Sequence, residues 1–160
     1  MLCTTEIYET IENGSGFFQH GHTYLGHPVV SAAGYAVVQA ILTRNLVPRV
    51  RKMGDKLDKA LKAQFGLHPH VGDIRGRGLF RALELVKDRE TKTPFDSAIG
   101  LAGKIKKAAF AAGLICYPMS GTRDGKNGDH VLLAPPYILE DQHIDEIVSK
   151  LSIALAVCLT

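Results

Sequence analysis

The chain has 160 residues, and 46% of them are hydrophobic, which suits one domain with a buried core or a part of a larger protein. Its net charge of +3 comes from Lys and Arg residues that are scattered along the sequence. The most basic stretch, residues 44–62, also carries Asp55 and Asp58, which is typical of a solvated helix face. We therefore expect no nucleic-acid partner.

The cysteines and the hydropathy of the sequence predict the compartment in which the protein is found. The three cysteines, Cys3, Cys116 and Cys158, are odd in number and lie in apolar surroundings, which argues against a disulfide framework. This favours a reducing compartment, so we expect a cytoplasmic location, with a mitochondrial one as the alternative. No apolar run has transmembrane length and the N-terminus lacks a signal-peptide pattern, so no membrane partner is expected.

The first third of the chain predicts two helices with a polar loop between them. Residues 2–5 read as the end of a buried strand, and residues 6–11 as a short helix that Asn13-Gly14-Ser15-Gly16 ends. Residues 28–41 are apolar on all sides behind Pro28. A helix of that composition is buried within its protein or is covered by another subunit.

The next segment predicts an amphipathic helix followed by two strands. The helix ends at Gly66, and one face carries an apolar stripe made of Leu46, Val50, Met53, Leu57 and Leu61. Residues 71–86 then read as two strands that meet around Gly76-Arg77-Gly78.

The remainder alternates between helix and strand. We expect a helix over residues 97–112, ended by Gly113, with three inward residues, Ala98, Ile105 and Ala109. Strands are expected over 114–117 and 130–134, with a polar loop at 120–128.

A last helix is expected over 140–158, with an inward face made of Ile144, Val148, Leu151 and Leu155. Residues 66–160 therefore predict a small α+β unit.

The most informative segment is residues 17–28, where polar residues alternate with glycines ahead of an apolar helix. The three histidines His20, His22 and His27 raise the hypothesis of a zinc site, but the loop has no Cys, no carboxylate and no His-x-x-x-His spacing. We therefore expect no metal. An anion site remains, because glycines and a hydroxyl precede a helix N-terminus. A turn that packs on its own helix is the alternative.

Four motifs give this chain a family resemblance. The segment 16–28, GFFQHGHTYLGHP, resembles the signature of the class III aminotransferases, the ω-transaminase group that uses pyridoxal phosphate. Three further matches follow in the same order: VGDIRGRGL at 71–79, ELVKD at 84–88, and GDH at 128–130 leading to APPY at 134–137.

The resemblance implies the C-terminal part of a fold-type I transferase, an α/β protein that ends in a small α+β domain. On this basis residues 1–45 are a remnant of the large cofactor-binding domain, with the dimer-interface loop and helix. Residues 46–160 are then a connecting helix and the small domain. The implied activity is transfer of an amino group between an amine or amino acid and a keto acid, in a homodimer.

The resemblance also implies that the lysine which binds the cofactor covalently lies ahead of residues 2–5. None of the lysines in this sequence, such as Lys104 or Lys126, lies at the matching position. We therefore assign no catalytic residue and expect no activity from these residues alone. A non-catalytic α+β module that pairs through its apolar helix is the alternative function.

Thr23 is the cofactor-binding residue that the resemblance implies. The matching threonine of such dimers reaches across the interface to the phosphate of the partner subunit's cofactor. His22 and Tyr24 are expected to shape the loop by packing at the interface.

Substrate recognition is implied for Arg123. Ornithine-type members carry a carboxylate-binding Arg where this sequence has Leu132, so this chain is not expected to belong with them. Other members place a mobile Arg in the preceding loop, where Arg123 stands; a solvated surface role is the alternative. Arg75 and Arg77 also have two interpretations, a carboxylate site or surface salt bridges, and the flanking glycines favour the second.

Overall fold

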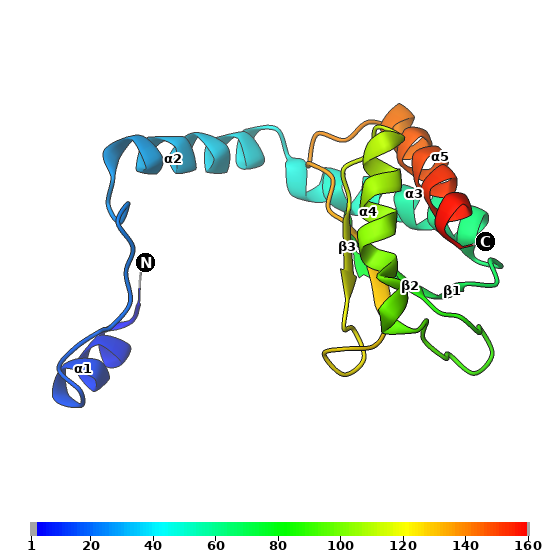
Figure 1. Ribbon diagram of the computed structural model, residues 1–160. Coiled ribbons are helices and arrows are strands. Elements are labelled where there is room, and N and C mark those ends of the chain that lie inside the picture. Colours follow the sequence, from blue (N-terminus) through cyan, green and yellow to red (C-terminus); the bar gives the residue numbers. More distant parts are fainter. Residues whose placement is uncertain (1–2, 160) are drawn as a thin grey trace. The chain divides into compact units, whose positions relative to one another are not determined.

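A computed structural model describes residues 3–159 and shows two compact units, residues 1–39 and 40–160 (Figure 1). The division at residue 39 is a property of the contacts within the chain. The assignment of residues 1–45 to a larger domain stays a prediction.

The first unit begins with helix α1, Thr5–Asn13. Thr4 has an extended backbone, and its hydroxyl oxygen accepts a hydrogen bond from the Ile7 N–H at 3.4 Å, which caps the helix. The predicted strand is therefore wrong for residues 3–5, because Thr4 serves as an N-cap; residues 1–2 lie outside the described part. Gly14 follows the helix and donates its N–H to the Thr10 carbonyl.

Helix α2, Pro28–Thr43, confirms the predicted apolar helix, and none of its residues is buried. Val29 is 69% exposed and Tyr35 is 68% exposed. An exposed apolar surface of this kind is typical of an interaction site.

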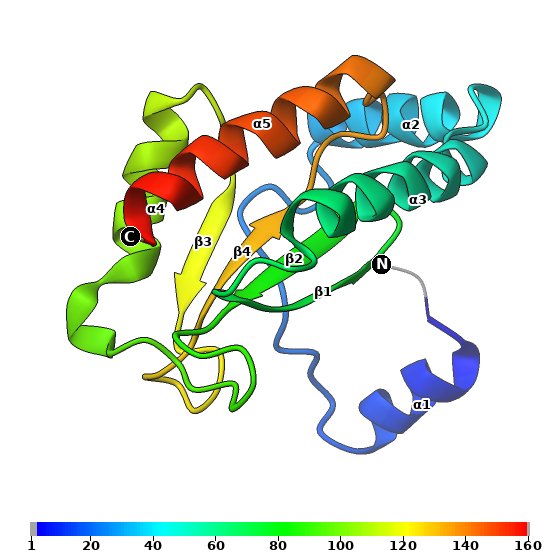
Figure 2. The same ribbon diagram turned by 90° about the vertical axis from the view of Figure 1, so that its right-hand side faces the viewer.

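The second unit contains three long helices and a four-stranded antiparallel sheet of order β1-β2-β4-β3 (Figure 2). The helices are α3, Leu46–Phe65, α4, Leu101–Ala111, and α5, Asp141–Cys158. The strands are β1, Val71–Arg77, β2, Phe80–Leu85, β3, Tyr117–Ser120, and β4, Asp129–Leu133.

Alternating side chains give the sheet one buried face and one open face. Leu83 and Leu85 of β2 and Val131 and Leu133 of β4 are almost fully buried against the helices. The amphipathic stripe predicted for α3 is confirmed, with Leu57 and Leu61 at 0% exposure and the others buried or half-buried, namely Leu46, Val50 and Met53. The opposite face of the sheet is not covered by these helices.

Two predicted boundaries are wrong, one because of a single glycine and one because of strand pairing. The helix expected over 97–112 is interrupted at Gly100, whose φ of +62° separates a short 3₁₀ turn, Ser97–Ile99, from α4. Ala98 is therefore exposed, whereas Ile105 and Ala109 are buried as expected. The strand expected over 114–117 begins only at Tyr117, because pairing with β4 decides its bounds.

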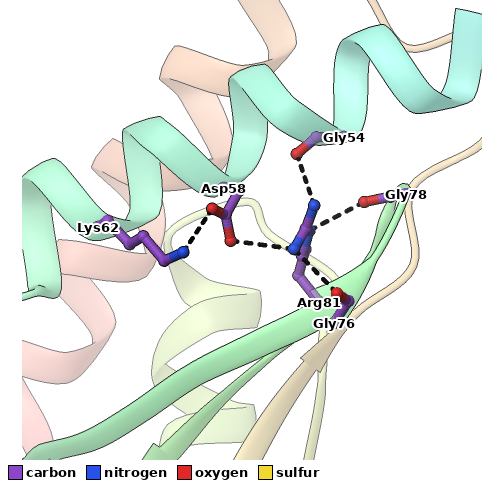
Figure 3. Close-up of polar contacts among 6 residues, drawn as sticks. All are labelled: Gly54, Asp58, Lys62, Gly76, Gly78 and Arg81. Atoms are coloured by element: carbon purple, nitrogen blue, oxygen red, sulfur yellow. Dashed lines mark hydrogen bonds and ion pairs between the residues drawn. The ribbon is translucent and has the colours of Figure 1, made fainter.

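A buried arginine joins the β1–β2 hairpin to α3 (Figure 3). Arg81 is 8% exposed and donates to three carbonyl oxygens, those of Gly54, Gly76 and Gly78, at 2.9–3.1 Å. Its Nη1 also lies 3.0 Å from Oδ1 of Asp58. Each of its three nitrogen atoms therefore donates at least one hydrogen bond, and the hairpin is held in one position on the helix.

Candidate functional site

The polar loop ahead of α2 is built from two successive turns. The Leu25 N–H donates to the His22 carbonyl at 3.0 Å, and the His27 N–H donates to the Tyr24 carbonyl at 3.0 Å. Gly26 has φ +71°, which lets the second turn lead directly into the helix at Pro28.

Thr23 lies within the first of these turns and is exposed. Its hydroxyl has no hydrogen-bond partner among residues 3–159, and no atom lies within 4 Å of the position that a Cβ on Gly26 would occupy. A free hydroxyl and open backbone just ahead of a helix N-terminus fit a phosphate group. Among residues 3–159 no group of three metal-ligating side chains lies together.

Arg123 lies in the second unit, in an ordered extension of the β3–β4 hairpin. Its N–H donates to the Asn127 carbonyl at 2.9 Å, and the Thr122 N–H donates to the Gly128 carbonyl at 3.2 Å. Asp124 accepts hydrogen bonds from the Asn127 side chain and from the N–H groups of Asn127 and Lys126, which lower its pKa to about 2. The backbone is thus fixed, and the exposed Arg123 side chain is the free part.

The open face of the sheet carries a second polar site that the sequence analysis did not find. A cavity of about 310 Å³ lies over the central strands, and Thr122, His130 and Leu132 line one side of it. The Thr122 hydroxyl lies 2.6 Å from Nδ1 of His130. The alternation along β4, which turns His130 and Leu132 to the same face, was the available signal. Arg123 is not among the residues that line this cavity.

Arg75 on β1 forms the surface salt bridges that the flanking glycines favoured. Its Nη1 lies 2.8 Å from Oδ2 of Asp73 and 2.5 Å from Oε2 of Glu84 on the neighbouring strand. The two carboxylates raise the pKa of the guanidinium, first through their hydrogen bonds.

A comparison with protein families decides the relationship of this chain. The family described as Aminotransferase class-III matches residues 1–155. The chain belongs to the class III aminotransferases. An aminotransferase of Gibberella zeae is 44% identical over 160 residues, which cover 99% of this chain and 31% of that protein.

Solved structures of transaminases have the same fold. An (S)-enantioselective omega-transaminase from Thermomicrobium roseum superposes with a TM-score of 0.81 at 29% identity, over 98% of this chain and 33% of that one. A PLP-bound aminotransferase mutant from Vibrio fluvialis gives 0.80 at 33% identity, over 96% and 32%. The fold prediction is confirmed, and the chain spans about a third of the length of these relatives.

Pyridoxal phosphate is accordingly the cofactor of the family to which this chain belongs. The preference for an enzyme over a non-catalytic module is supported, since the aminotransferase match runs through both units. Within residues 3–159, none of the helices is long and apolar enough to span a membrane.

Proposed function

We propose that the natural polypeptide carrying these residues is a transaminase that moves an amino group from an amine or amino acid to a keto acid. The observation that carries this is the class III match over residues 1–155. Pyridoxal phosphate, when bound, stores the amino group between the two half-reactions and withdraws electrons from the reacting carbon. The 160 residues supply part of the site and, on this proposal, none of their lysines binds the cofactor covalently.

Thr23 is proposed to hold the phosphate of the cofactor bound by the other subunit of a homodimer. Its exposed hydroxyl, beside the free backbone at Gly26, supports this role. The exposed apolar surface of α2 supports the dimer, because a second copy is the simplest surface to cover it.

Arg123 is proposed to bind the substrate carboxylate. A guanidinium on a fixed hairpin can meet a carboxylate through two parallel hydrogen bonds and turn away when the substrate has none. The three free cysteines support a reducing compartment, and we place the protein in the cytoplasm.

The experiment is an amino-transfer assay of the natural polypeptide with pyridoxal phosphate, an amine donor and pyruvate. Thr23→Val should weaken cofactor retention by roughly ten- to a hundredfold, because a hydrogen bond to an anion is lost. Thr10→Val is the control, since the Thr10 hydroxyl is used within α1, where it donates to the Glu6 carbonyl. Unchanged retention in the Thr23 variant would leave Thr23 a packing residue.

Arg123→Ala should raise the KM for pyruvate and change the KM for a carboxylate-free amine much less. Lys126→Ala removes an exposed cation from the same hairpin and is the matched control. An equal loss for both substrates would assign Arg123 to loop structure. A complete lack of cofactor-dependent amino transfer in the unaltered protein would overturn the proposed function.

A further inference from the structure

A larger cavity, of about 960 Å³, opens in the second unit where α3, α5 and residues 134–140 meet (Figure 2). Nη2 of Arg49 on α3 donates to the Leu139 carbonyl at 2.6 Å, and Nζ of Lys56 lies 2.5 Å from Oδ1 of Asp141 at the start of α5. These two contacts hold the walls of the cavity in place. Its volume lies within the range of small-molecule sites.

Two arginines that line this cavity have donors that the protein does not use. Arg49 is half-buried, and among residues 3–159 only its Nη2 has a hydrogen-bond partner, so Nε and Nη1 stay available. Arg44 lies in the turn ahead of α3 and is exposed, and its guanidinium has no hydrogen-bond or ion-pair partner in the described part of the chain.

His143 of α5 adds a third donor. The Glu140 N–H donates to Nδ1 of His143 at 3.1 Å. A backbone N–H can only donate, so Nδ1 carries no proton and the ring proton of the neutral imidazole is on Nε2. Nε2 has no partner among the described residues, which leaves this N–H free beside the cavity.

The two carboxylates that line the cavity already have partners of their own. Oε2 of Glu146 lies 2.9 Å from Nζ of Lys150, and Oε2 of Glu140 accepts a hydrogen bond from the Gln142 side chain at 3.4 Å. Asp141 also faces Arg49, but it is bound by Lys56 and does not line the cavity. With Arg44, Arg49 and Lys150 against two carboxylates, the lining has an excess of positive charge.

The remaining lining is apolar and stiff. Leu114 and Leu133 are 9% and 3% exposed, and Pro135 and Pro136 follow β4 directly. Proline has a fixed φ and no backbone N–H. A flat apolar group can therefore lie against this part of the wall without leaving a backbone donor unpaired.

We propose that this cavity binds an organic phosphate of mononucleotide size, with its phosphate on Arg44, Arg49 and Nε2 of His143 and its flat ring against Pro135 and Pro136. A phosphate monoester has three terminal oxygens and close to two negative charges at neutral pH, which matches the three donors and the excess of positive charge. The proposal does not rest on the transaminase function, because none of these residues is assigned to amino transfer.

The test is a calorimetric titration of the 160-residue chain with adenosine 5′-monophosphate (AMP), without pyridoxal phosphate. We expect one site with a Kd below about 1 mM, and binding weaker by about tenfold or more for adenosine and for inorganic phosphate, since each lacks one half of the ligand. On ¹³C-labelled histidine rings, AMP should shift the signal of His143 alone among the seven histidines. His143→Gln assigns that signal and keeps a side chain suited to the third position of the helix.

Arg44→Gln should weaken AMP binding by about tenfold, and Arg49→Lys, which keeps the charge but removes the fork, by several-fold. The exposed Arg44 side chain makes no contact that the fold needs, so its variant tests the site even if Arg49→Lys does not fold. Arg51→Gln removes an exposed arginine of α3 that does not line the cavity and is the matched control.

The proposal is overturned if AMP does not move the His143 signal, if adenosine or inorganic phosphate binds as tightly as AMP, or if Arg51→Gln weakens binding as much as Arg44→Gln. Because no amino transfer is measured, this outcome is independent of the activity assay.

Discussion

Nη1 of Arg81 lies 3.0 Å from Oδ1 of Asp58, and this ion pair links the second strand of the sheet to the middle of α3. Asp58 also receives Lys62 at 2.7 Å from the next turn of the helix. The two cations differ in burial, since the Arg81 side chain is 9% exposed and the Lys62 side chain 57%. The same carboxylate therefore has one buried and one exposed partner. We expect the two partners to contribute different amounts to the free energy of unfolding.

Arg81→Met should destabilise the protein by about 3–5 kcal/mol, because it leaves three carbonyl oxygens without their donor and leaves the half-buried Asp58 carboxylate with the exposed Lys62 alone. Lys62→Met should cost less than about 1 kcal/mol, since an exposed ion pair contributes little. Urea unfolding measures both. Equal losses in the two variants would show that burial does not distinguish the two partners of Asp58.

Gly54→Ala should destabilise the contact between α3 and the β1–β2 hairpin. A Cβ on Gly54 would lie 2.3 Å from the backbone carbonyl of Gly78, so the elements would have to separate. We expect a loss of about 2 kcal/mol or more in thermal or urea unfolding.

Gly103→Ala is the matched control, because it is a helical glycine of α4 with no atom within 4 Å of its Cβ position. It should raise stability by about 0.5–1 kcal/mol through helix propensity. A loss at Gly103 similar to that at Gly54 would contradict the close approach as the cause.

The Asp124 carboxylate should titrate in NMR spectra with a pKa of about 2, below its ordinary 3.8. The hydrogen bonds that lower this pKa stabilise the hairpin above the ordinary value, and that stabilisation is lost as the pH falls from about 4 towards 2. Asn127→Ala removes the main cause and should move the Asp124 pKa back towards 3.8. An unchanged pKa in that variant would contradict the assigned cause.

Asp129 and Asp141 should show opposite pH dependences. Burial raises the pKa of Asp129, although the Ala102 N–H donates a hydrogen bond to its carboxylate. The ionised form of Asp129 is therefore less favourable in the folded protein than in the unfolded chain. Asp129→Asn keeps an acceptor without charge and should gain stability relative to the unaltered protein as the pH rises from about 4 to 7.

Nζ of Lys56 lies 2.5 Å from Oδ1 of Asp141, and this hydrogen-bonded ion pair lowers the pKa of Asp141. Asp141→Asn should therefore lose relative stability as the pH rises through about 4, because the stabilising charge forms only above that pH. Urea unfolding at several pH values compares the two variants. Parallel curves for both would contradict the assigned environments.

The amino-acid sequence by itself determined the helices and the family. The stripe on α3 and the all-round apolar pattern of α2 are local periodicities, so they predict helices without knowledge of the fold. The loop at 16–28 likewise contains its motif in one continuous segment. Both kinds of signal are carried by neighbouring residues.

Only the tertiary structure decided which distant residues share a site. Arg75 and His130 line one cavity because β2 lies between β1 and β4, and no local pattern encodes that strand order. The late start of β3 at Tyr117 follows equally from its pairing with β4. Strand register depends on contacts between remote segments, and for that reason the open-face cavity could not be read from the chain alone.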